Sequence, residues 1–290
     1  MTSRRAPEPR TQRTQLGAEL RRVRMLAGLS GRKIARATGL SQARVSRIER
    51  GVSVPSLPEA AAWAAAAGVS DDRRAVILAL AEAAVNEVAT FRARLSHGLA
   101  AVQDSVRDLE ASARVIRNFQ PGIIPGLLQT ADYARRIMAF ADITSGGGYG
   151  AAVAARLSRQ QALHDPARSF EFLVTEAALR YRPGPPATLT AQLDHLAAVA
   201  TLETITFGVI PADAQMHAIT RCGFILYEDR TGDQPPVAAV ETPHASLHAS
   251  DPADVALYRD QLARLRESAV NGAGALNIVR SIAHPQQPPP

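Results

Sequence analysis

A short helix is predicted just after residues 38–40, and its first two turns carry side chains that suit recognition of DNA bases: Gln42, Ala43, Ser46 and Arg47. Gln42 can pair bidentately with adenine and Arg47 with guanine, while Ala43 can contact only a thymine methyl group. Each good bidentate pair discriminates against a wrong base by about 1–3 kcal/mol. These residues therefore predict a helix that enters the major groove of double-stranded DNA.

The surrounding segments are predicted to form a helix-turn-helix that positions this helix. Ser30 and Ser41 suit the N-cap of the two central helices, and Gly39 between them permits the positive φ that a tight turn requires. Apolar residues at helical spacing predict three further helices around the same core. Five helices are thus expected, over residues 15–27, 30–37, 42–50, 57–67 and 71–89.

The charge of the chain is unevenly distributed. Residues 1–50 hold thirteen Lys and Arg against three Asp and Glu, so this segment is +10 while the remaining 240 residues are −4. A basic N-terminal segment followed by an acidic remainder is typical of a chain that binds a polyanion through one end. Four residues near the two central helices are best placed for phosphate contacts, which fix register without reading sequence: Arg32, Lys33, Ser41 and Arg44.

Composition limits the other classes of protein. The single cysteine, Cys222, excludes an intramolecular disulfide framework, so we expect an intracellular chain, in the cytoplasm and associated with the nucleoid. No apolar run reaches the roughly 18–20 residues of a membrane span, and no membrane partner is expected. The length suggests about two domains.

The fold class that we predict is a mainly α N-terminal five-helix helix-turn-helix domain, followed by an α+β C-terminal domain with a small sheet flanked by helices. We expect a disordered basic arm over 1–13, the DNA-binding domain over 14–89, and a helical connector over 90–118. The α+β domain follows over 119–283 and a disordered tail over 284–290. Period-two patterns predict the strands of the sheet, at 169–175, 204–210, 223–227 and 237–241.

Signals for enzyme chemistry are weak. Glu241, His244 and His248 have a spacing that suggests a metal site, but Pro243 and the preceding strand favour a loop. The glycine-rich residues 146–150 lack the lysine of a phosphate-binding loop, and Cys222 is best explained as a small buried strand residue. No nucleophile, base and orienting group occur together. We therefore expect no enzyme, no metal and no cofactor.

Residues 16–56 resemble the phage-repressor type of helix-turn-helix, the xenobiotic-response-element family of bacterial regulators. The resemblance is carried by the segments 16–17, 20–21, 28–30, 34–35, 39–42 and 45–49, with Arg24, Gly51, Pro55 and Ser56. It implies an internal ion pair between Arg24 and Glu49 that fixes the recognition helix against the first helix. One position departs from the family: Gly31 stands where a glutamine usually bridges a phosphate and the first recognition residue.

The body resembles the second domain of actinobacterial regulators of sporulation and antibiotic production. The resemblance is carried by the segment 119–130 with its two Pro-Gly steps, by Tyr133 and Ala134, and by residues 159–160, 163, 176–180 and 223–224. It implies an antitoxin-like role beside a small partner protein encoded nearby. The region expected to bind a partner or ligand consists of Phe119, Gln120, Pro121, Gly122, Ile124, Pro125, Gly126, Leu127, Leu128 and Tyr133.

A single helix-turn-helix domain reads only a few base pairs. A sufficient preference over non-specific DNA therefore normally requires a dimer that binds paired half-sites. We therefore expect a homodimer that is held by residues outside 16–70. For the C-terminal domain two roles remain open. In the first it binds the small partner protein and thereby alters DNA binding; in the alternative it senses a small-molecule ligand.

Overall fold

The structure is a computed structural model that describes residues 12–90, 98–141, 149–219, 221–229, 235–242 and 245–285. It divides into two compact units, the first of which runs to Ala89 along the chain. Residues 1–11 of the predicted arm, most of the predicted glycine loop and residues 286–290 of the tail lie outside the described residues, while residues 12 and 13 of the arm begin a helix. No described helix is both long and apolar enough to cross a membrane.

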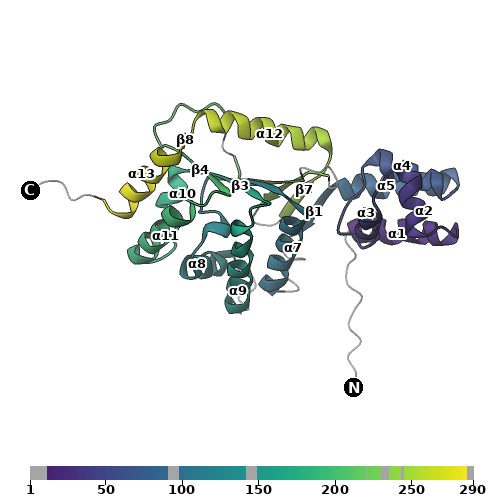
Figure 1. Ribbon diagram of the computed structural model, residues 1–290, viewed down its shortest axis with the longest axis horizontal. Helices are drawn as coiled ribbons and strands as arrows, with labels where there is room; N and C mark the ends of the chain where they lie inside the picture. Colours follow the sequence, from purple (N-terminus) through teal and green to yellow (C-terminus); the bar gives the residue numbers. More distant parts are fainter. Residues whose placement is uncertain are drawn as a thin grey trace, which may run out of the picture. The chain divides into compact units, whose positions relative to one another are not determined.

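Five helices build the N-terminal unit, as predicted (Figure 1). They are α1 (Gln12–Leu26), α2 (Gly31–Thr38), α3 (Gln42–Glu49), α4 (Leu57–Ala66) and α5 (Asp71–Val85). One core joins them, with the largest buried side chains being Leu16, Leu20, Ile34, Ile48, Trp63 and Ile77. The predicted fifth helix is four residues too long, because Asn86–Thr90 forms strand β1.

Among the described residues of the C-terminal unit, seven strands follow the order β7-β6-β5-β2-β3-β4-β8. They are β2 (Val115–Gln120), β3 (Ser169–Thr175), β4 (Ile205–Ile210), β5 (Phe224–Glu228), β6 (Val237–Glu241), β7 (Ala245–Ala249) and β8 (Val270–Asn271). The central strands β2, β3 and β4 are parallel, whereas β5 and β8 run antiparallel to β2 and β4. The sheet is therefore mixed, and the predicted α+β class is confirmed.

Helices cover the two faces of this sheet unequally. Figure 1 shows α12 (Pro252–Glu267) on one face and the helices α7 to α11 on the other. Those helices are α7 (Gly98–Ser112), α8 (Ala131–Ala141), α9 (Tyr149–Arg159), α10 (Glu176–Arg180) and α11 (Pro186–Val199), and α13 (Gly272–Ala283) packs on α11. The main core lies on the face of Ile116, Phe170 and Phe172, where Leu193 of α11 and Val279 of α13 pack.

Most predicted strands are confirmed, but the predicted helical connector over 90–118 is wrong in its last part. Strands β3 and β6 have the predicted bounds, β4 begins one residue later than predicted, and β5 is shifted by one residue at both ends. Only Gly98–Ser112 of the connector is helical among the described residues, and Val115–Gln120 forms the central strand β2. Four of its six residues are buried, so no simple alternation marks it as a strand.

Candidate DNA-binding surface and the C-terminal segment

The turn between α2 and α3 is closed by the residues that the sequence predicted. The Ser30 hydroxyl accepts a hydrogen bond from the Lys33 amide, and the Ser41 hydroxyl accepts one from the Arg44 amide, each at 3.2 Å. Gly39 takes φ +72°, a left-handed conformation that costs other residues energy. The start of α3 is thus fixed by its own capping chemistry.

The N-terminal residues of α3 face solvent. Ser41, Gln42, Ala43 and Ser46 are all exposed, which leaves the three predicted base-reading side chains among them accessible. Arg47 differs, because its side chain is partly buried and its Nε atom lies in the interior without a hydrogen-bond partner. Its terminal guanidinium nitrogens, rather than Nε, are the atoms that could reach a base.

Arg44 does not belong to the exposed set, which corrects the prediction that it contacts phosphate. Its side chain is 10% exposed, and Nη2 donates to Oε2 of Glu59 on α4 at 2.9 Å. The same Glu59 oxygen accepts from the Ser56 amide at 2.8 Å, within a capping box that starts α4. The Arg44 charge is therefore satisfied inside the domain.

The ion pair between Arg24 and Glu49 fixes the other end of α3. Arg24 Nη2 donates to Glu49 Oε2 at 2.9 Å and Nε donates to Oε1, while Nη1 donates to the Leu29 carbonyl at 2.8 Å. The hydrogen bond and the negative charge of Glu49 raise the pKa of the Arg24 guanidinium. Two ion pairs, Arg24–Glu49 and Arg44–Glu59, thus hold the recognition helix against α1 and α4.

Exposed basic side chains lie on α2 and at the C-cap of α3. Arg32 and Lys33 on α2 are exposed, as a phosphate contact requires. Arg36 and Arg50 are exposed as well, and Arg36 could have been found from its spacing of four residues from Arg32 on the same helix. At Gly31 an added Cβ would lie 3.9 Å from the nearest heavy atom, so the position has room for a side chain.

The predicted partner or ligand region of the C-terminal domain lies mostly in its core. Phe119, Ile124, Leu128 and Tyr133 are each fully buried, Leu127 is 4% exposed, and Pro125 is buried too. These residues cannot contact a partner protein while the domain is folded. The members of the region at or near the surface are Gln120, Pro121, Gly122 and Gly126.

Buried glutamines hold this Pro-Gly segment, residues 119–130, in place. Gln129 donates from Nε2 to the Ile124 carbonyl at 2.7 Å. From α11, Gln192 donates to the Leu128 carbonyl and accepts from the Thr130 amide, both at 2.7 Å. After the end of β2, the two Pro-Gly steps leave only a short 3-10 turn, Gly126–Leu128, so side chains satisfy backbone groups that a longer helix or a sheet would satisfy.

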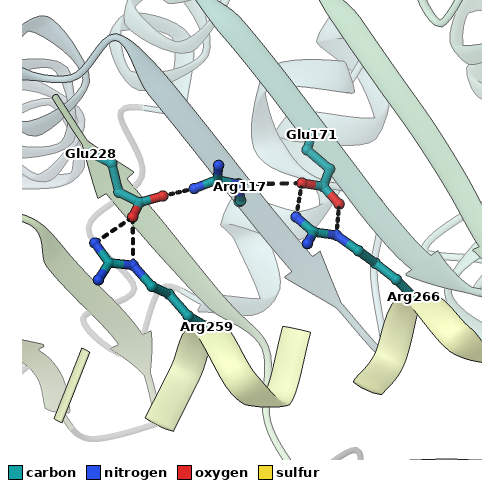
Figure 2. A network of polar contacts seen from close by, with 5 residues as sticks. All are labelled: Arg117, Glu171, Glu228, Arg259 and Arg266. Carbon is teal, nitrogen blue, oxygen red and sulfur yellow. Dashed lines mark hydrogen bonds and ion pairs between the residues drawn. The ribbon is translucent and has the colours of Figure 1, made fainter. Parts of the chain in front are cut away.

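The sheet face under α12 carries a second polar feature, a ladder of alternating charges (Figure 2). Arg117 on β2 lies between Glu171 on β3 and Glu228 on β5 and forms ion pairs with both. From α12, Arg259 pairs with Glu228 and Arg266 with Glu171. Each carboxylate is therefore held by two guanidiniums, and the ladder fixes α12 on the sheet.

A cleft of about 410 Å³ opens beside this ladder. It is lined by Val115, Arg117, Ser169, Phe170, Glu171, Thr206, Glu228 and Asp229. The cleft is polar. Its two glutamates, Glu171 and Glu228, are held in ion pairs with arginines, so a ligand could bind them only by breaking those pairs. Among the described residues, no group of three His, Cys, Asp or Glu side chains could hold a metal ion.

Two family models match the chain. A helix-turn-helix domain matches residues 15–77, which include most of α1, all of α2 to α4 and the first half of α5. A domain of unknown function, DUF5753, matches residues 103–281 and so covers more than half of the chain. No curated protein matches the chain, and no solved structure matches it. The N-terminal unit is therefore a helix-turn-helix domain of the DNA-binding kind, and the chain belongs to the DUF5753 family.

Proposed function

We propose that this chain is a sequence-specific transcription regulator that binds double-stranded DNA through α3 and catalyses no reaction. The observation that carries the proposal is the exposed start of α3 on a helix that is fixed at both ends. A rigid recognition helix keeps its side chains at the positions that base contacts require. A mobile helix would have to be ordered on binding, and the conformational entropy lost would reduce the affinity for DNA. We place its action at the chromosome, in the cytoplasm.

Base contacts and phosphate contacts have separate carriers in this proposal. Gln42 and Arg47 would make bidentate contacts to adenine and guanine, with Ala43 and Ser46 beside them. Arg32, Lys33 and Ser41 would bind phosphates, together with the exposed Arg36. The proposed contacts thus place sequence discrimination on α3 and most of the salt-dependent affinity on α2.

We propose that the regulator acts as a homodimer on two half-sites. One head that reads a few base pairs cannot reach the roughly 10³–10⁷-fold preference over non-specific DNA that regulators of this kind show. Half-sites one helical turn apart, about 34 Å, would follow from two-fold symmetry. Sedimentation of the free protein and of its complex with a selected duplex measures the stoichiometry, and full affinity from a monomer would refute the dimer.

Selection from random duplexes, followed by anisotropy measurements on the enriched sequence, tests the DNA-binding proposal. The full chain should enrich one sequence family, and Gln42→Ala should lose about 5–150-fold in affinity for it while keeping its affinity for unrelated DNA. Lys33→Gln should weaken binding to all duplexes and reduce the salt slope by about one. Absence of any enriched sequence, or equal effects of both variants on every duplex, would contradict the proposal.

For the C-terminal domain we propose an input role that alters DNA binding. The family resemblance suggests a small partner protein encoded nearby as the input, in an antitoxin-like arrangement. A small-molecule ligand is the second candidate, and it is favoured by the burial of the Pro-Gly segment, which offers a partner few side chains. Anisotropy of the DNA complex with and without the purified small protein discriminates the two, since only the first candidate requires that protein for a change in affinity.

A further inference from the structure

Two arginines of α9, Arg156 and Arg159, lie near one carboxylate of the C-terminal domain, but only Arg159 pairs with it. Arg159 is buried, and it donates from Nε and Nη2 to the two oxygens of Glu110 on α7 at 2.8 and 2.5 Å. Both side chains of this pair are less than a tenth exposed. This bidentate pair uses the full charge of Glu110, so nothing of it remains for the second arginine, Arg156.

Arg156 contacts only neutral acceptors within hydrogen-bonding distance among the described residues. Its Nη1 donates to Oε1 of Gln129 at 2.5 Å, and its Nε donates to Oε1 of Gln103 at 3.4 Å. Gln103 Oε1 also accepts from Arg159 Nη1 at 2.5 Å. Arg156 therefore has no carboxylate within hydrogen-bonding distance among the described residues, whereas Arg159 beside it has Glu110.

The surroundings of Arg156 disfavour its protonated, positively charged form. Burial and the neighbouring Arg159 lower the pKa of Arg156 to about 10, and the more distant carboxylates of Glu241 and Glu110 oppose the shift only in part. A charge that is taken out of water without an ionic partner destabilises the fold. A glutamate at position 103 would remove this cost, because Gln103 already contacts both guanidiniums, yet a neutral amide stands there.

The geometry around Arg156 is held firmly rather than left to solvent. Gln129 is 1% exposed, and its backbone carbonyl accepts from Gln160 Nε2 at 2.7 Å. The guanidinium lies beside Gly126 of the Pro-Gly segment, where an added Cβ would sit 3.6 Å from Arg156 Cζ. Gly126 therefore contributes no side chain to that side of the partly buried guanidinium.

We propose that Arg156 binds a small oxyanion, a carboxylate or phosphate group, at the junction of α7, α9 and the Pro-Gly segment. A planar guanidinium with free N–H groups matches two oxygens of such a group bidentately. The bound anion supplies the negative charge that Gln103 and Gln129 do not. The effect of this ligand on DNA binding rests on the proposed input role, but the binding itself does not.

Titration calorimetry of the full chain with inorganic phosphate and, separately, with acetate tests the site, with chloride at equal ionic strength as the reference. Binding of either probe is expected, and the probe that binds identifies the oxyanion class. Arg156→Met should weaken binding at least tenfold. Gln103→Glu should weaken it as much, because it supplies an internal carboxylate, and should raise the melting temperature without the probe.

Arg180→Met is the matched control, because Arg180 is an exposed arginine of the same domain whose ion pair is with Glu176. It should bind the probe as the wild type does. Absence of binding by both probes, or full binding by Arg156→Met and Gln103→Glu, would overturn the site. These measurements contain no DNA, so a protein that fails to bind DNA would refute the proposed function and leave this test unaffected.

Discussion

Arg44 on α3 donates a hydrogen bond from Nη2 to Oε2 of Glu59 on α4 at 2.9 Å, across fifteen residues of sequence. This contact decides between two roles for an arginine on a recognition helix. An arginine that binds phosphate contributes to the salt dependence of DNA binding, whereas one that is paired internally contributes to the position of the helix.

The first prediction follows from that pair. Arg44→Met and Glu59→Gln should each lower the free energy of unfolding of the N-terminal unit by about 1–3 kcal/mol, because each leaves a partly buried charged partner unsatisfied. Trp63 is the only tryptophan of the chain and is fully buried in this unit, so its fluorescence during urea unfolding measures the effect.

The double variant separates the internal role from a phosphate contact. The Arg44→Met and Glu59→Gln effects should not add, since both remove one interaction. The salt slope of DNA binding should stay at its wild-type value in all three proteins. A slope that falls by about one in Arg44→Met alone would show that Arg44 binds phosphate after all.

A second prediction concerns Glu49, whose side chain is 12% exposed and paired with Arg24. Glu49→Ala should lower the free energy of unfolding by about 2–4 kcal/mol, because it leaves the Arg24 guanidinium unpaired in a partly buried site. Its base preference in a duplex selection should match that of the wild type. A normal melting temperature for this variant would refute the structural role of the pair.

Gly17 provides a third prediction, at the contact between α1 and α3. An added Cβ at this position would lie 2.4 Å from the Ile48 carbonyl oxygen, which is backbone and cannot rotate away. Gly17→Ala should therefore displace α3, lower stability by about 1–3 kcal/mol and weaken DNA binding.

Gly31→Ala is the matched control for Gly17→Ala, because an added Cβ there has room and lies at the start of a helix. Alanine is favoured over glycine in helices by up to about 1 kcal/mol, so this variant should be as stable as the wild type or more stable. Equal stability of Gly17→Ala and Gly31→Ala in urea would show that α1 and α3 are not tightly apposed.

The fourth prediction is a pH dependence in the C-terminal domain. His195 on α11 has a buried Nε2 without a hydrogen-bond partner, and burial lowers the pKa of its imidazole below 6.5. Below pH 6.5 the unfolded chain binds a proton that the folded chain resists, so stability falls as the pH falls through that value. His195→Leu should flatten this fall, as measured by far-UV circular dichroism in urea at pH 7 and pH 5.

The control for His195 is His164→Leu in the same domain, because the His164 side chain is exposed. It should leave the pH dependence of the wild type intact. If His195→Leu loses stability between pH 7 and pH 5 as steeply as the wild type does, the buried imidazole is not the group responsible.

Local chemistry was predictable from the sequence, and long-range pairing was not. Ser30, Gly39 and Ser41 act within four residues of themselves, so their capping and turn roles could be inferred from spacing. Arg44 was misassigned because its partner Glu59 lies on another helix, although Arg44 stands four residues before the buried Ile48 and so shares its face of α3. The prediction that Arg44 binds a phosphate treated its buried side chain as part of the solvent-exposed face of α3.

The sheet shows the same division. Strand β3 alternates clearly in its first residues and was predicted at its bounds, whereas β2 is buried on both faces and reads as the end of an amphipathic helix. The ladder of Arg117, Glu171 and Glu228 exists only because β2 lies between β3 and β5. No motif could have found it, since strand order decides which residues become neighbours.

The central position of β2 in the sheet also determines when the C-terminal unit can fold during synthesis. The strand is flanked by β3, about fifty residues later, and by β5, more than a hundred residues later, so it stays without its second neighbour until residue 228 has left the ribosome. The core that joins the helices α1 to α5 consists of residues within 16–84. Contacts that are local in sequence form early and distant ones form late. The N-terminal unit of the nascent chain can therefore already be folded while most of the C-terminal unit is still being translated.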